Sequence, residues 1–449
     1  MHYVVIHKQA DKKTSGRGSI YVFMHNASMH KNATNPFTFG DLALDEAFTD
    51  REDEVRELAS DMRNGQNVLV YAPRRYGKSS LVLRAGQEAM QKKALVGYVD
   101  LMKTPTKERF AAALAKTIYA DIASPVDQAF ERAAELFRGL RVRPTMEVDP
   151  SDGTLRFSFQ AGRRKEDIDD TIERLLELLG EQAAERKRRV VIIFDEFQEV
   201  LSLDKRFPNL MRAVFQAQPE VGHVYLGSKR HLLERIFNDK NEPFWRSAKQ
   251  LEIGMISPAK FASFIRDRFM NSGTGITSDA LDRLLSATGG HPYGTQELAY
   301  FVWELITPGG EASVADVEEA LSRVIRSEHN HFAQLWDDAP HPQRLLMLSL
   351  ADEPSRNLYS ADYHSRHELP ANPTLQTALA GLVKKEIAGL NGDGEYCVIE
   401  PFFAEWLQRE QRDYGVGQRL RNSEGTSPRK RPRSKRRSDG RRRSSKDGA

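Results

Sequence analysis

The feature that most constrains this chain is an apolar run followed by a turn that ends in Gly77-Lys78-Ser79. The run from Val68 to Tyr71 is typical of a β-strand, and the residues from Ser80 to Met90 follow a helical pattern. In such an arrangement the backbone N–H groups of the loop and of the helix start point at phosphate oxygens, where the helix dipole also favours negative charge. The stretch therefore predicts a phosphate-binding loop.

This loop departs at one position from the P-loop pattern G-x-x-x-x-G-K-[ST], because Ala72 stands where the pattern has its first Gly. Alanine adds one methyl group, so we expect the turn to survive. Lys78 would reach the β- and γ-phosphates of ATP, and the Ser79 hydroxyl would bind Mg²⁺. The alternative is a chance match at a basic helix start, which the strand–loop–helix context argues against. The expected nucleotide-binding residues are those of the loop and helix start: Ala72, Pro73, Arg74, Arg75, Tyr76, Gly77, Lys78, Ser79 and Ser80.

A second stretch places two carboxylates at the end of an apolar run. The five residues from Val190 to Phe194 suit a parallel strand that is buried on both faces, and Asp195 and Glu196 follow directly. Asp195 would hold Mg²⁺ through water, and Glu196 would orient and deprotonate the attacking water. The alternative is an ordinary strand end with a solvated acidic turn, which the upstream P-loop makes the weaker interpretation.

A further strand, from His223 to Ser228, ends in a polar residue. In a parallel sheet its carboxyl end lies beside the P-loop, where ligands bind. Ser228 could sense the γ-phosphate or could be an ordinary strand-end serine, and the residues leave both open. Arg230 and Arg246 follow, and either could reach a phosphate, although surface arginines seldom do. The candidate catalytic residues are thus Glu196, Lys78 and Ser228.

The order of elements predicts an α/β fold with several parts. Strands alternate with helices, which argues for a parallel, helix-covered sheet. Thr49 or Asp50 is expected to cap a helix running to about Arg63. We expect a poorly structured N-terminus (1–34), a P-loop core (35–256) with a β-hairpin inserted at about 144–160, a helical lid (257–337), a winged helix (338–411) and a disordered basic tail (412–449).

The winged-helix expectation rests on three helical segments followed by a hairpin around Asn391-Gly-Asp-Gly394. Such domains bind DNA through the third helix, and others make plain protein contacts, so both readings stay open. The third helix is modestly basic and offers Thr374, Gln376, Thr377, Lys384 and Lys385.

Charge and composition separate the tail from the rest. From Arg421 onward the chain has twelve Lys or Arg residues against three acidic ones, while the whole chain carries a net charge of only +3. Such a tail would bind polyanions through counterion release, or would simply solubilise the protein. The single cysteine, Cys397, excludes an internal disulfide framework and a Cys-based zinc site. No apolar run is long enough to cross a membrane, so we expect a cytoplasmic protein with no membrane contact.

With these residues in view, the chain resembles the prokaryotic archaeal-type ATPases, which are P-loop proteins of the STAND group related to initiator-type AAA+ ATPases and have a C-terminal winged helix. The resemblance covers about residues 35–411. It rests on Asn35-Pro36-Phe37, Phe48-Thr-Asp-Arg51-Glu52, Pro73-Arg-Arg-Tyr-Gly-Lys78-Ser, Ile193-Phe-Asp195-Glu196-Phe-Gln198, Gly227-Ser228, Pro243-Phe244 and Gly290-His-Pro292-Tyr-Gly-Thr-Gln296.

The resemblance implies that the segment from Phe48 to Arg51 lies near adenine and that Pro292 touches the base from the lid. It also implies a sensor role for Ser228. The sequence departs from the family at Ala72 and at Gly294, where the family often has a bulky residue.

Together these features predict an ATP-binding, slowly hydrolysing switch with ATP and Mg²⁺ as ligands, in which bound ATP would fix the angle of the winged helix. One alternative is a DNA-binding regulator whose nucleotide is structural. Another is a signalling scaffold that forms homo-oligomers through the core and contacts a protein partner through the winged helix.

Overall fold

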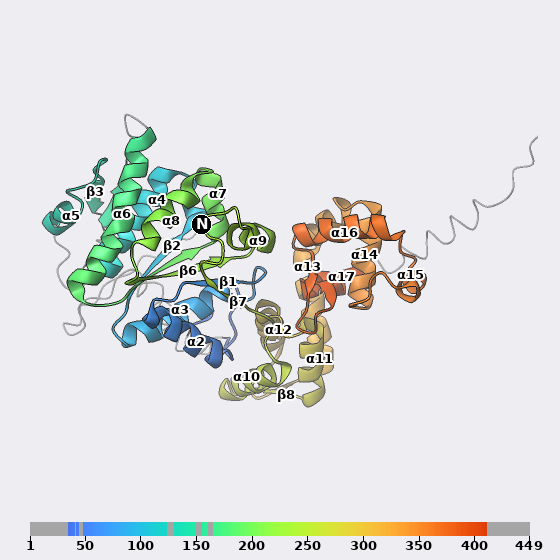
Figure 1. Cartoon of the computed structure of the whole chain (residues 1–449). Helices are drawn as coiled ribbons and strands as arrows, with labels where there is room; N and C mark the ends of the chain where they lie inside the picture. The colour runs from blue at the N-terminus through green and yellow to red at the C-terminus, as the bar shows by residue number, and fades with distance from the viewer. Residues whose placement is uncertain are drawn as a thin grey trace, which may run out of the picture.

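A computed structural model describes residues 35–40, 42–44, 48–123, 130–148, 155–159 and 165–410. The expectations for residues 1–34 and for the basic tail fall outside the described residues. Figure 1 shows an α/β part, a group of helices below it and a second helical part that carries the C-terminal elements. Among the described residues, no helix is both long and apolar enough to cross a membrane.

The α/β part is built on a five-stranded sheet in the order β2-β5-β6-β1-β7. All neighbouring strands run parallel, which confirms the predicted sheet. The strands are β1 Val68–Tyr71, β2 Leu95–Asp100, β5 Val190–Asp195, β6 Val221–Gly227 and β7 Lys249–Glu252. Because β1 lies between β6 and β7, the loop that follows it opens at the carboxyl edge of the sheet, beside the ends of these two strands.

Helices cover both faces of this sheet (Figure 1). On β5, Val191 and Ile193 pack toward α2 and α3, while Ile192 and Phe194 pack toward α4, α6 and α8. Burial on both faces explains why β5 is continuously apolar rather than alternating. The covering helices are α2 Glu52–Asn64, α3 Lys78–Gln91, α4 Lys107–Thr117, α6 Lys165–Arg186 and α8 Phe207–Gln216.

The remaining elements of this part are short. The predicted hairpin is present as an antiparallel pair, and Phe157 packs its ring 5.5 Å from Phe137 and 5.7 Å from Tyr119. The Asp-Gly turn between its strands lies outside the described residues. These elements are η3 Leu101–Lys103, η4 Ile118–Ala123, α5 Phe130–Leu136, β3 Thr145–Val148, β4 Leu155–Ser158, η5 Phe197–Glu199, α7 Val200–Leu203 and α9 Arg230–Asn238.

The expected cap of α2 is wrong. Neither Thr49 nor Asp50 caps the helix, because its N-cap is Arg51, in a left-handed conformation with φ 67° and without a side-chain capping bond. The Arg51 guanidinium instead donates from Nη2 to the carbonyl of Gly254 at 2.7 Å. The start of α2 is thus bonded to the segment after β7.

The described residues from Pro258 to Glu410 are mainly helical and include the predicted winged helix. The first helices of this part are α10 Pro258–Asn271, α11 Ser278–Thr288, α12 Pro292–Leu305 and α13 Val314–Asp337, with the short parallel pair β8 Gly275–Ile276 and β9 Glu311–Ala312. The winged helix has α14 His341–Asp352, α15 Ala361–His367, α16 Asn372–Lys384, an antiparallel hairpin of β10 Ala388–Leu390 and β11 Tyr396–Val398, and α17 Pro401–Glu410.

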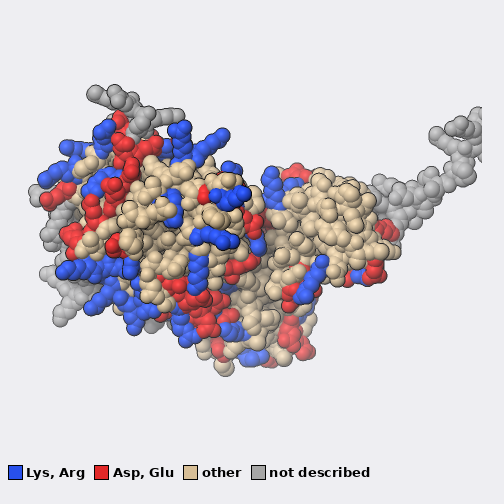
Figure 2. Space-filling model, in the orientation of Figure 1, with Lys and Arg blue, Asp and Glu red and all other residues tan. Residues whose placement is uncertain are grey.

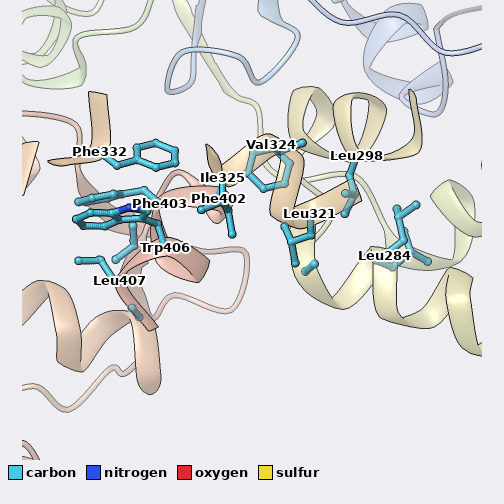
Figure 3. Packing of buried hydrophobic residues seen from close by; sticks show 14 of the residues in the cluster. Leu284, Leu298, Leu321, Val324, Ile325, Phe332, Phe402, Phe403, Trp406 and Leu407 are labelled. Carbon is cyan, nitrogen blue, oxygen red and sulfur yellow. The ribbon is translucent and has the colours of Figure 1, made fainter. Parts of the chain in front are cut away.

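The helices α10 to α13, which form the expected lid, share one hydrophobic core with the winged helix. Figure 3 shows this core running from Leu284 and Leu298, through Leu321 on α13, to Phe403 and Trp406 on α17. The indole Nε1 of Trp406 donates to Nδ1 of His329 at 3.1 Å, so the largest buried side chain is also hydrogen-bonded. Since α13 passes through both parts, the lid and the winged helix are packed as one unit.

Candidate functional site

The loop between β1 and α3 has the curled backbone that a phosphate site needs. Gly77 is the N-cap of α3 with φ 80°, and Arg75 two residues earlier has φ 67°. Left-handed residues of this kind bend a loop so that successive N–H groups converge on one point. Ala72 is buried at the start of the loop, so the turn forms with alanine in place of the first glycine.

Lys78 lies inside this loop. It is only 7% exposed, and its Nζ donates to the carbonyl oxygens of Ala72 and Pro73, each at 2.9 Å. Burial lowers the pKa of Lys78, while the nearby carboxylates of Glu196 and Asp195 act in the opposite direction. Two carbonyl groups of the loop thus hold the ammonium group inside the loop, where a phosphate-binding lysine is expected.

Asp195 at the end of β5 is bonded to residues of β2 and α3. Its Oδ2 accepts a hydrogen bond from Ser79 Oγ at 3.0 Å and a short one from the Tyr98 hydroxyl, and its Oδ1 accepts from the backbone N–H of Glu196 at 2.8 Å. Burial raises the pKa of Asp195, and these hydrogen bonds oppose that rise. Sequence reasoning brought Ser79 and Asp195 together but missed Tyr98, which β2 places beside β5.

Glu196 and Ser228 meet at the ends of neighbouring strands. Oε2 of Glu196 accepts from Ser228 Oγ at 3.0 Å and from the amide of Gln198. Glu196 has φ 51°, so its backbone turns sharply off the end of β5. A Cβ on Gly227 would lie 2.3 Å from Oε1 of Gln198, so a larger residue there would displace the Gln198 side chain. The role of Gln198 was also missed, although the sequence shows it two residues after Glu196.

The residues expected near adenine lie just before α2. Phe48 packs against the hydrophobic cluster formed by α2, α3 and the P-loop face of the sheet. Arg51 is nearly buried by its contact with Gly254. The backbone N–H of Ala43 donates to Ser80 Oγ at 3.1 Å, which brings the preceding segment against the helix start. Their contact with a base stays a prediction.

The turn that begins α12 touches the P-loop. Pro292 occupies the first turn of the helix, and the ring of its neighbour His291 lies 5.1 Å from Tyr76. The backbone N–H of Ile256 donates to the carbonyl of Gly290 at 3.0 Å, so the turn is tied to the segment after β7. A contact between Pro292 and a base stays a prediction.

The packing around Gly294 explains why the sequence has a small residue where the family often has a bulky one. A Cβ there would lie 3.2 Å from Pro401 Cγ, at the start of α17. The small residue therefore allows α12 to approach the winged helix closely.

The two candidate arginines have other partners. The Arg230 guanidinium bonds to Glu234 at 2.8 Å and to Glu252 at 2.9 Å. That of Arg246 lies 5.3 Å from the ring of Trp245. Neither contact involves the P-loop, and a phosphate contact by either arginine stays a prediction.

The winged helix also reaches the P-loop, which sequence reasoning missed. Arg75 Nη1 donates to Glu400 Oε2 at 3.5 Å, and its guanidinium lies 4.4 Å from the ring centre of Tyr293. Ile399 packs against the cluster that contains Ala72 and Tyr76. The residues of each pair are more than 200 positions apart in the sequence, so no local sequence pattern predicts these contacts.

Solved structures with a similar fold include ATPases. The Walker-type ATPase of Pyrococcus abyssi aligns with TM-score 0.58 and 16% identity over 83% of this chain and 99% of that chain. The ORC1 protein of Aeropyrum pernix, solved in complex with DNA, gives 0.42 and 14% over 83% and 95%. The Holliday junction branch migration motor RuvB of Thermotoga maritima gives 0.39 and 12% over 84% and 97%. The last two scores are too low to support an argument, and the first shows a shared fold.

Comparison with curated proteins found no match. A family model described as a probable winged helix domain matches residues 330–409, in agreement with the elements α14 to α17. The family model of an ATPase domain predominantly from Archaea matches residues 48–298, which is more than half of the chain, and the chain belongs to this ATPase family.

Proposed function

We propose that the protein binds ATP with Mg²⁺ at the P-loop, hydrolyses it slowly, and uses the nucleotide to control how the lid and winged helix sit on the core. The observation that carries this proposal is the convergence of Lys78, Ser79, Asp195, Glu196 and Ser228 at the carboxyl ends of β1, β5 and β6. A phosphate chain, a metal ion and an attacking water need these side-chain types within one small volume.

The residues present fit Mg²⁺. Ser79 Oγ and the Asp195 carboxylate are oxygen donors that already lie 3.0 Å apart. Mg²⁺ commonly binds one or two protein oxygens and completes its shell with water and phosphate. Bound there, it would neutralise charge on the phosphates.

Hydrolysis requires two side chains to leave their present partners. Lys78 would exchange the carbonyls of Ala72 and Pro73 for phosphate oxygens. The Glu196 carboxylate would accept the proton of a water whose oxygen attacks the γ-phosphorus, while the bond to the β–γ bridging oxygen breaks and ADP leaves. Ser228, freed from Glu196, would donate to a γ-phosphate oxygen.

The bound nucleotide would lie between core and lid. We propose that Phe48 and Arg51 border the adenine and that Pro292 contacts it from the start of α12. Because the lid and the winged helix share one core, a shift of α12 would carry the winged helix with it.

DNA is the partner that we place first for the winged helix. Along α16 the side chains of Thr374, Gln376, Thr377, Lys384 and Lys385 are all exposed. In Figure 2, basic and acidic side chains mix over the core and the visible face of the winged helix is largely uncharged. The uncharged face of the winged helix supports the second candidate role, which is contact with a protein partner or with a second copy of the chain.

Phosphate release with and without duplex DNA tests the proposal and chooses the partner. We expect the full-length protein to hydrolyse ATP and duplex DNA to increase the rate of turnover. Lys78→Ala should lose both turnover and nucleotide binding. Turnover that persists in Lys78→Ala would refute the site. If DNA left the rate of turnover unchanged, contact with a protein partner would become the favoured role of the winged helix.

Removing residues 421–449 separates the tail from the winged helix. If the basic tail contacts the DNA backbone, the truncated protein should bind all duplex sequences more weakly and with a shallower dependence on salt. An unchanged affinity and salt slope would exclude the tail as the contact.

A further inference from the structure

Glu386 lies in the tight turn that joins α16 to β10 at the base of the winged-helix hairpin. It has φ 58°, a left-handed backbone that bulky residues seldom adopt. The turn is held in place on both sides, because Glu386 N–H donates to Val383 at 3.0 Å and Ile387 is bonded to both Leu382 and Ile399 at 3.0 Å. The position of this side chain is therefore set by the fold of the hairpin.

The base of the hairpin rests on the P-loop. Ile399, which pairs with Ile387, packs against the hydrophobic cluster that holds Ala72 and Tyr76. The next residue, Glu400, bonds to Arg75. This brings the carboxylate of Glu386 into the charged surroundings of the nucleotide site.

Four charged groups from the core act on Glu386: Arg74 and Lys78 of the P-loop, Glu196 at the end of β5, and Lys229 after β6. Burial raises the pKa of Glu386, the three cations lower it and Glu196 raises it. Oε1 of Glu386 is buried and has no hydrogen-bond partner among the described residues. An acceptor in the field of these cations is thus left unsatisfied.

These groups mark the place of the terminal phosphate. In the proposed site the γ-phosphate of ATP must lie within reach of Lys78 and next to the water held by Glu196. Both residues act on Glu386, so the carboxylate and a γ-phosphate would compete for one region and the same cations. ADP has no group there and can share the site with the carboxylate.

We propose that Glu386 determines nucleotide specificity, in that its carboxylate makes the closed arrangement of winged helix and P-loop accept ADP and reject ATP. This inference rests on the proposed function. Two anions in one region repel each other, so ATP binding displaces the hairpin base, and the shared core moves the lid and winged helix together. Loss of the γ-phosphate lets the hairpin return.

The first test compares the affinities of the full-length protein for Mg-ADP and for a non-hydrolysable ATP analogue by calorimetry. Glu386→Gln keeps the shape of the side chain and removes its charge. We expect it to tighten analogue binding about tenfold, equivalent to about 1.4 kcal/mol, and to change ADP binding less than twofold. Glu319→Gln, on the exposed face of α13 and paired with Arg323, is the matched control and should alter neither.

The second test reads the position of the hairpin through Cys397, the only cysteine of the chain. Cys397 lies on β11, partly buried near Tyr76, and burial raises the pKa of its thiol to about 11. Its reaction with a maleimide should therefore be slow in the closed state. The ATP analogue should accelerate it several-fold in the wild-type protein, and ADP should not.

The outcomes separate the two proposals. If both nucleotides bind and Glu386→Gln leaves their affinity ratio unchanged, the role of Glu386 is refuted while the nucleotide site stands. The same holds if the analogue binds without accelerating the reaction of Cys397. If the wild-type protein and the variant bind neither nucleotide, the proposed function fails and the inference falls with it.

Discussion

Asp195, the buried carboxylate that the sheet supplies to the candidate site, has all its acceptors bonded, whereas the winged helix brings buried carboxylates with unused acceptors. Both oxygens of Asp195 have partners in the core. In contrast, Glu386 and Glu400 each bury one carboxylate oxygen that has no hydrogen-bond partner among the described residues.

That difference indicates which side is built to move. A buried acceptor without a partner costs free energy, so the closed contact is weakened at the point where it meets the P-loop. The core side has no such cost at Asp195 and can stay fixed when ligands arrive. Variants that change one side at a time test this difference.

The largest expected effect comes from the shared core of the lid and winged helix. Trp406 is 1% exposed and its ring stacks on Phe403 at 5.8 Å. Trp406→Ala should lower the stability of this unit by about 3–5 kcal/mol, because it leaves a large cavity. Thermal unfolding followed by tryptophan fluorescence measures the loss. Trp245→Ala, at an exposed position, should change stability by less than about 0.5 kcal/mol. Equal effects of the two variants would contradict the shared core.

A smaller effect is expected from Glu297 on α12. Burial raises its pKa to about 7; the carboxylates of Glu400 and Glu328 add to this rise, and Arg75 opposes it. Between the ordinary carboxyl pKa of 4.5 and about 7, the folded protein keeps a proton that the unfolded chain has lost. Stability should therefore fall as the pH rises through this window, by on the order of 3 kcal/mol.

Glu297→Gln tests this directly, because the amide cannot ionise. Its urea unfolding midpoint should lack this fall with pH, and the variant should be more stable than the wild-type protein at pH 8. If the two proteins lost stability in parallel between pH 5 and pH 8, Glu297 would not be the group responsible.

The smallest expected effect concerns the core side. Tyr98→Phe removes one hydrogen bond from Asp195 and leaves that of Ser79 in place. We expect the Mg²⁺ concentration for half-maximal turnover to rise about three- to tenfold, in line with the loss of about 1 kcal/mol. The thermal midpoint should stay close to that of Tyr359→Phe, an exposed position on the winged helix. A fall in stability without a shift in Mg²⁺ dependence would make Tyr98 a purely structural residue.

The two sides of the site also differ in how much of each could be predicted from the sequence. Lys78, Ser79, Asp195 and Glu196 lie in short motifs, and the rule that parallel strands share a carboxyl edge brought Ser228 to them. Tyr98 was missed because it lies inside β2, where nothing in the pattern distinguishes it from a core aromatic. The strand β7 was missed because its alternating residues are only half-buried at the edge of the sheet.

The winged-helix side could not be predicted for a different reason. The contacts of Arg75 with Glu400 and of Tyr76 with His291 depend on how the second half of the chain folds back over the first. No local propensity encodes such a pairing. The predicted cap of α2 was wrong for the same reason, since the side chain of Arg51 donates to the carbonyl of Gly254, about 200 residues away.

The role of Glu196 is tested by steady-state phosphate release from the full-length protein and from its Glu196→Gln variant, with ATP binding measured in both. We expect the variant to bind ATP like the wild-type protein and to lose turnover by about 10²- to 10⁴-fold, because its amide cannot accept the proton of the attacking water. Equal turnover in the two proteins would contradict the assignment of Glu196 as the base, and with it the account of the site.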